Sequence, residues 1–208
     1  MKFQFYLISI LLVPALLFTE CRNHGENKKD VVKQSPGVIT GKPSGEIVSL
    51  HKAALDGDLS LVERLLDNGF KVDSVDEDGR TPLIYAAYNG HTNVIKKLIQ
   101  KGAFVNFTDQ QGRTPLMMAA SGPFPEAVKL LLDNQADPDM RDKNDRFTAI
   151  MFAAYEGQLD VVRILLASNA DPFLKDKDGN NALTFAEKNN HMEVATVLKS
   201  FRDKSGKK

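Results

Sequence analysis

Four histidines, two acidic turns and a single cysteine are the side chains of this sequence that could do chemistry. Imidazole nitrogens and carboxylate oxygens bind metal ions, and a thiolate is both a metal ligand and a nucleophile. Whether such groups act together depends on the elements that hold them. The first question is therefore which of these groups the chain could bring into contact.

The histidines do not form a candidate metal site. His91 and His191 occupy the same place in two copies of an internal repeat, three copies apart. At about 10 Å per stacked copy, they would lie roughly 30 Å from each other. Ligands of one zinc ion bind at about 2 Å. His24 lies in a polar segment, so we expect no shared metal ion.

The acidic turns at residues 76–79 and 176–179 fail as calcium loops. With Gly79 aligned to the sixth position of such a loop, Ser74 and Tyr85 fall at positions that need Asp and Glu. The second turn fails in the same way. The sequence also contains no glycine-rich phosphate loop and no Gly-x-Ser-x-Gly motif. We therefore expect a protein that is not an enzyme, with no catalytic residues, metal or cofactor.

Cys21 follows the longest apolar run of the chain. After Lys2, the 14 residues from Phe5 to Phe18 contain no charge. A helix that crosses a bilayer needs roughly 20 apolar residues, whereas a run of this length is typical of a secretory signal peptide. No Ala-x-Ala cleavage site follows the run; the cysteine does.

This arrangement resembles a bacterial lipoprotein signal, in which the cysteine is lipidated and becomes the new N-terminus. The resemblance implies that acyl chains on Cys21 hold the protein on a membrane. The sequence departs from the usual motif, because Phe18 stands where leucine is usual and Glu20 where a small residue is usual. The alternative is a buried or idle cysteine beside an uncleaved anchor.

Composition separates a polar segment from an acidic body. Residues 22–45 are rich in Lys, Gly, Ser, Pro and Asn and lack periodic apolar positions, which predicts a flexible tether. Residues 46–201 carry 17 Lys and Arg against 23 Asp and Glu. Because nucleic acids need a clustered cationic surface, this acidic body argues against a nucleic-acid partner.

The rest of the chain aligns with itself at a period of about 33 residues. Residues 78–87, Asp-Gly-Arg-Thr-Pro-Leu-Ile-Tyr-Ala-Ala, return at 111–120 as Gln-Gly-Arg-Thr-Pro-Leu-Met-Met-Ala-Ala. Thr114 thus stands in the second of these copies where Thr81 stands in the first. Further partial copies lie at residues 50–54, 146–154 and 178–183.

The period and the Thr-Pro-Leu-x-x-Ala motif resemble the ankyrin repeat family. The resemblance implies an all-α fold, an ankyrin repeat solenoid of stacked helix-turn-helix units with short β-hairpin turns. It also implies that His51 makes a hydrogen bond within its turn. The predicted division is a signal peptide (1–20), a lipidated cysteine and flexible tether (21–45), a repeat domain (46–201) with repeats at about 46–75, 76–108, 109–141, 142–175 and 176–201, and a disordered tail (202–208).

Local chemistry predicts the same helices independently. Thr81 and Thr114 are good N-cap residues, and Pro82 and Pro115 fit the first helical position, where a missing N–H costs nothing. Paired alanines after each start let neighbouring helices approach closely. Glycines end the helices with a left-handed residue, a role for which Gln135 is a poor candidate.

Ankyrin stacks bind proteins with their hairpin tips and the exposed side of the first helix of each repeat, so the resemblance implies a partner-binding surface there. Arginine and tyrosine often anchor interfaces. One residue inserted near Phe147 enlarges one tip. For individual residues, an ordinary solvated surface is the alternative. The predicted partner-binding residues are Glu77, Asp78, Arg80, Tyr88, Gln110, Gln111, Arg113, Ser121, Lys143, Asn144, Arg146, Phe147, Tyr155, Glu156, Lys177, Asp178 and Asn180.

These observations lead to one preferred hypothesis. It is a non-catalytic protein-binding scaffold, an exported ankyrin repeat lipoprotein that captures a protein partner in the bacterial cell envelope. We expect a monomer, bound to a membrane through its lipid and facing the periplasm or the cell surface. The alternatives are an inhibitor or protective chaperone of an envelope enzyme, an unrecognised hydrolase, and a secreted or periplasmic soluble protein.

Overall fold

The computed structural model describes residues 39–40 and 47–206. The predictions for the signal peptide, for Cys21 and for most of the tether lie outside these residues. Within them, ten helices follow one another as five helical hairpins. Two short strands precede the first helix.

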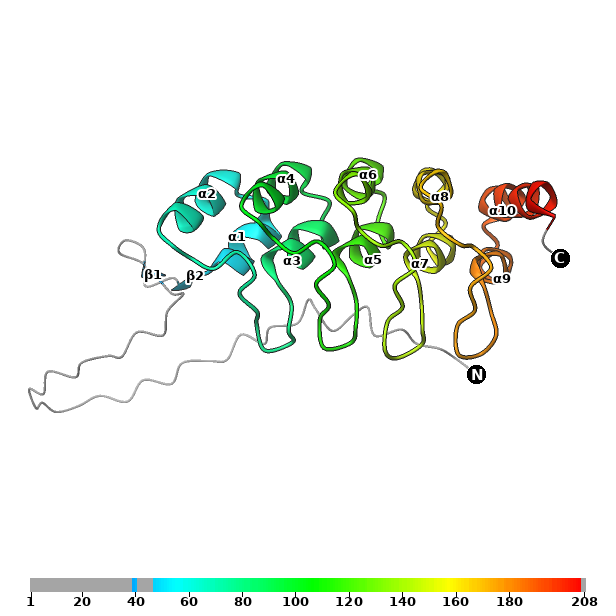
Figure 1. Cartoon of the computed structure of the whole chain (residues 1–208), viewed down its shortest axis with the longest axis horizontal. Helices are drawn as coiled ribbons and strands as arrows, with labels where there is room; N and C mark the ends of the chain where they lie inside the picture. Colours follow the sequence, from blue (N-terminus) through cyan, green and yellow to red (C-terminus); the bar gives the residue numbers. More distant parts are fainter. Residues whose placement is uncertain (1–38, 41–46, 207–208) are drawn as a thin grey trace, which may run out of the picture. The chain divides into compact units, whose positions relative to one another are not determined.

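The helical hairpins stack side by side in two rows (Figure 1). Each helix packs on its hairpin partner and on its neighbours in the same row, which confirms the predicted all-α stack. We call the two rows the first helices and the second helices. The first helices are α1 (Leu50–Asp56), α3 (Pro82–Tyr88), α5 (Pro115–Ala120), α7 (Ala149–Tyr155) and α9 (Ala182–Lys188), and the second helices are α2 (Leu59–Asp67), α4 (Thr92–Gln100), α6 (Pro125–Asp133), α8 (Leu159–Ala167) and α10 (Met192–Ser205).

The first helices begin where the Thr-Pro pairs predict. The Thr81 hydroxyl accepts a hydrogen bond from the Ile84 N–H at 3.3 Å, and Thr114 caps α5 through Met117 at 3.2 Å. A proline occupies the first turn of both helices. These bonds satisfy N–H groups that have no partner inside the helix.

Paired alanines form the seam between neighbouring first helices. Both alanines of each pair in α3, α5 and α7 are fully buried, and the leucines that the second helices turn inward are buried with them. Small side chains let the helices approach closely, so one continuous core runs through all five repeats.

The second helices end in left-handed residues, and one expectation about them was wrong. Gln135 takes the left-handed conformation with φ 67°, as Asn169 does with φ 63°. Gly69 and Gly102 hold this place in the first two repeats with φ 87°. The geometry of the repeat therefore overrides the poor intrinsic fit of glutamine.

The first repeat begins before residue 46. Strand β1 (Ile39–Thr40) pairs antiparallel with β2 (Ile47–Val48), with Ile39 opposite Val48. Ile39 precedes Val72 by 33 residues, one repeat period. Strand β1 therefore lies within the segment predicted as the tether (21–45).

The C-terminal helix is longer than predicted. Helix α10 continues to Ser205, so the first residues of the predicted 202–208 tail are helical. The Phe201 ring lies 6.4 Å from that of Phe173, and Lys199 pairs with Glu187 at 2.8 Å. None of the helices in the described residues is long and apolar enough to span a bilayer.

Candidate protein interface

A tight turn precedes each first helix from α3 onward. We call these turns the hairpin tips, residues 76–80, 109–113, 142–147 and 176–180. An aspartate closes each tip; Asp76 Oδ1, for example, accepts the N–H groups of Asp78 at 2.9 Å and Arg80 at 2.8 Å. The equivalent aspartates of the later tips do the same within their own turns. Each tip is therefore stabilised by an aspartate of its own turn.

Backbone hydrogen bonds also join each tip to the next. The Gln110 N–H donates to the Asp78 carbonyl at 3.0 Å. The same bond recurs between Lys143 and Gln111 at 2.8 Å and between Lys177 and Asp145 at 3.0 Å. The tips therefore form one connected edge along the stack (Figure 1).

A second series of hydrogen bonds joins neighbouring repeats through side-chain acceptors. These bonds were not predicted from the sequence. The Asp73 carboxylate accepts the Phe104 N–H at 3.2 Å, and the Asp139 carboxylate accepts the Asp171 N–H at 2.9 Å. Asn106 links the second repeat to the third in the same way, because its side-chain oxygen accepts the Asp137 N–H. The signal was available, because an Asp or Asn recurs once per repeat period from Asp73 through Asn106 to Asp139.

The structure places sixteen of the predicted partner-binding residues at exposed or half-buried positions of the tips and first helices. Phe147 is the exception, because it is buried and cannot offer a ring to a partner. The exposed residues are Glu77, Asp78, Gln110, Lys143, Asn144, Arg146, Lys177 and Asp178, and the half-buried residues are Arg80, Tyr88, Gln111, Arg113, Ser121, Tyr155, Glu156 and Asn180.

Two of the three predicted anchor arginines already have partners inside the protein. Arg113 pairs with the Asp109 carboxylate at 2.7 Å, and its side chain is 22% exposed. Arg80 pairs with Asp78 at 3.0 Å and lies 5.9 Å from the centre of the Tyr85 ring, with 14% of its side chain exposed. Arg80 and Arg113 therefore serve mainly to hold the tips together.

The inserted residue enlarges the tip of the fourth repeat and shifts its register. The Asp142 N–H donates to the carbonyl of Phe147, five residues on, whereas the Asp76 N–H reaches Arg80, four residues on. Phe147 thus occupies the place of Arg80. Arg146, predicted near that place, lies one position earlier with φ 63°.

The Phe147 ring joins an aromatic cluster beneath the enlarged tip. Its centre lies 5.4 Å from that of Phe152 and 4.8 Å from that of Phe185. Phe185 in turn lies 6.1 Å from Tyr155. Phe152 and Tyr155 are half-buried, so part of this cluster faces solvent on α7.

Comparison with known proteins agrees with this geometry. A profile of ankyrin repeats (three copies) matches residues 50–142 and 121–207, most of the chain. The protein belongs to the ankyrin repeat family. It is 49% identical over 39 residues to an ankyrin repeat protein of fowlpox virus (strain NVSL). That match covers 19% of this chain and 28% of the viral protein, so the chain spans well under a third of the length of that relative.

Ankyrin repeats indicate a scaffold for protein–protein interaction. The three histidines of the described residues serve the structure of this ankyrin repeat protein. His51 Nε2 donates to the Ser74 carbonyl at 2.8 Å, the turn bond that was expected. His91 Nε2 donates to Leu55 O at 2.9 Å, and its ring covers Gly57, where an added Cβ would come within 2.6 Å of the imidazole. His191 repeats this contact over Gly157.

Phe124 takes the place of His91 in the third repeat. Its ring covers Gly90, and Pro125 begins α6 directly after it. The corner formed by residues 122–125, Gly-Pro-Phe-Pro, is therefore a structural variant of the turn between the two helices of a repeat.

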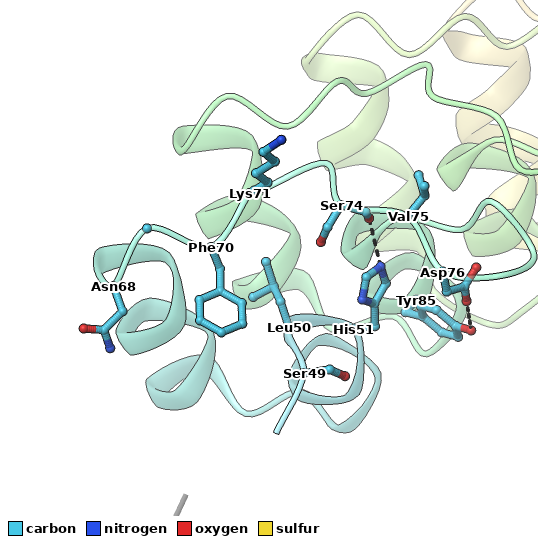
Figure 2. Close-up of a pocket in the computed structure, with 11 residues that line it drawn as sticks. Ser49, Leu50, His51, Asn68, Phe70, Lys71, Ser74, Val75, Asp76 and Tyr85 are labelled. Carbon is cyan, nitrogen blue, oxygen red and sulfur yellow. Dashed lines mark hydrogen bonds between the residues drawn. The ribbon is translucent and has the colours of Figure 1, made fainter. Parts of the chain in front are cut away.

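A pocket of about 700 Å³ lies beside the first repeat. Figure 2 shows the start of α1, the loop after α2 and Tyr85 around it. Two of its polar side chains are already paired, because His51 binds the Ser74 carbonyl and the Tyr85 hydroxyl donates to Asp76 at 2.6 Å. No group of three metal-binding side chains occurs in the described part of the chain.

Burial and hydrogen bonds shift the pKa of two carboxyl groups on the tips and of one at the end of α7 in this ankyrin repeat protein. Burial opposes ionisation of Asp76, but the hydrogen bonds from Tyr85 and the backbone outweigh it and lower its pKa. Burial raises the pKa of Asp142 above its ordinary value despite backbone hydrogen bonds. Burial likewise raises the pKa of Glu156, which His191 partly offsets.

Proposed function

We propose that this ankyrin repeat protein captures a protein partner with its hairpin tips and the adjacent side of its first helices, without catalysis and as a monomer. The observation that carries the proposal is the connected edge of tips, with exposed polar and charged side chains on every tip from residue 77 to 178. Because backbone bonds hold neighbouring tips together, binding would immobilise little further backbone.

We further propose that the capture takes place in a bacterial cell envelope, with Cys21 lipidated and the protein held on a membrane facing the periplasm or the surface. The apolar run from Phe5 to Phe18, followed by the cysteine, supports this proposal. One acyl chain gives only reversible membrane binding, so stable anchoring would need more than one.

Site-specific cross-linking in intact cells tests the capture. A photo-reactive residue at exposed positions Gln110 or Asn144 should cross-link to the same protein, identified by mass spectrometry. The matched control is Lys96, which is exposed on second helix α4. Equal cross-linking from Lys96, or no cross-linked protein from either tip, would contradict the proposal.

Metabolic labelling with a fatty acid tests the anchor. The wild type should incorporate the label, and Cys21→Ala should lose it, because the lipid would be attached through the thiol. Ser44→Ala, a substitution in the same segment, should label as the wild type does. Equal labelling of wild type and Cys21→Ala would refute lipidation at this residue.

A further inference from the structure

Arg146 takes a backbone conformation that the other tips give to glycine. Its φ is 63°, against 75° for Gly79, 79° for Gly112 and 83° for Gly179, and each of these residues directly precedes the last residue of its tip. A side chain is unfavourable there, because Cβ comes too close to the following carbonyl oxygen. Non-glycine residues held in such conformations cluster at functional sites.

Among the arginines of the tips, Arg146 is the one that a partner can reach. Its side chain is exposed, and within the described residues it forms no ion pair with a carboxylate, unlike Arg80 and Arg113. The side chain of Lys143, exposed on the same tip, donates to the Gln110 carbonyl at 3.3 Å. Lys143 and Arg146 therefore place two exposed cations on the enlarged tip, whose own carboxylates are either buried, as in Asp142, or paired with Lys177, as in Asp145.

Partly exposed aromatic rings adjoin the two cations of the enlarged tip. Phe147, the residue after Arg146, packs against Phe152 and Phe185, and the exposed parts of Phe152 and Tyr155 lie on α7. Tyrosine and arginine are among the residue types most often found at the hot spots of interfaces. A partner that fits needs a carboxylate for Arg146 and an apolar side chain for the rings.

We propose that the enlarged tip of the fourth repeat recognises an acidic segment of a protein partner, in which Asp or Glu side chains flank an apolar residue. Arg146 and Lys143 bind the carboxylates, and the apolar residue packs on Phe152 and Tyr155. This inference rests on the proposed protein-binding function and names the chemistry of the partner. The opposite charge of the segment and the tip also steers their encounter.

A labelled peptide tests the inference on the full chain. The probe is fluorescein-Gly-Asp-Glu-Phe-Leu-Asp-Glu-Gly, and binding is followed by fluorescence anisotropy. Arg146→Gly should weaken binding about tenfold while the melting temperature stays at or above that of the wild type, because glycine relieves the left-handed strain. A structural role for Arg146 predicts the opposite change in melting temperature.

Two further peptides and one variant serve as controls. Replacing Phe-Leu by Ser-Ser should weaken binding about tenfold, and replacing every acidic residue by Lys should abolish it. Lys96→Gln removes the same charge from the far row of helices and should leave the affinity unchanged. The inference is overturned if the wild type does not bind the acidic peptide, if Arg146→Gly binds it equally, if Lys96→Gln weakens it equally, or if Arg146→Gly lowers the melting temperature.

The cellular experiment separates this inference from the proposed function. If Arg146→Gly still cross-links to the same protein from residues 110 and 144 in wild-type yield, the stack captures a partner but the enlarged tip does not select it. If the wild type cross-links to no protein, the proposed function itself fails.

Discussion

Replacing Gly90 with alanine should lower the free energy of unfolding by about 2–4 kcal/mol. Gly90 has φ 68°, where a Cβ is strained, and an added Cβ would lie 2.2 Å from Phe124 Cδ1 and 2.4 Å from Cγ. The clash involves the base of a rigid ring, so it cannot be relieved by moving the end of a flexible chain. Chemical denaturation monitored by circular dichroism would measure the loss.

Gly102 provides the matched control. It has φ 87° but no atom within 4 Å of an added Cβ, so Gly102→Ala should carry the backbone strain alone, about 1–2 kcal/mol. Equal losses for the two variants would show that Phe124 moves freely, and would contradict the packing of the third repeat on the second.

Removing the Asp109 carboxylate has the second large expected effect. Its side chain is fully buried and accepts the Arg113 N–H at 2.9 Å and Nε at 2.8 Å. Asp109→Ala would leave this N–H without its acceptor and the guanidinium with only its bond to Gln111 Oε1 at 3.0 Å. We expect a loss of about 2–4 kcal/mol, at the low end if the partly exposed guanidinium regains water.

Asp178→Ala is the control for Asp109→Ala. Asp178 also lies on a tip, but its side chain is exposed, so its loss should change stability by less than about 0.5 kcal/mol. Thermal and urea unfolding of the two variants would give the comparison. Similar losses would mean that charge in the tips, and not the buried contacts of Asp109, determines stability.

The repeat could be read from the sequence because its signals are local. Thr81 and Thr114 cap helices next to their prolines, and the alanine pairs are buried wherever they recur. Each signal depends on a few adjacent residues. The regular period then arranges the helices, because one hairpin cannot bury its apolar face alone.

The enlarged tip could not be read in the same way. The inserted residue was recognised, but its position within the turn decides whether Arg146 or Phe147 takes the place of Arg80. Only the Asp142–Phe147 hydrogen bond settles that register. Alignment of the repeats therefore matched Arg146 with Arg80 and Arg113. It also placed the buried Phe147 on the partner-binding surface.

Pairing partners that the repeat motif does not reveal explain the remaining differences between prediction and structure. Nothing in the composition of residues 22–45 shows that Ile39 pairs with Val48. Arg80 and Arg113 were expected to be available to a partner, yet each pairs with an aspartate of its own tip, Asp78 and Asp109. Whether a surface arginine is available depends on which carboxylates fold next to it.

The bonds between successive tips also determine how the molecule would carry a mechanical load. Every helix–helix contact described above lies within one repeat or joins it to its immediate neighbour, so tension applied at α1 can reach α10 only through each interface in turn. The weakest of those interfaces would part first while the rest stay folded. If Cys21 does hold one end on a membrane, a pulled partner would be released by stepwise peeling of repeats before the whole stack unravelled.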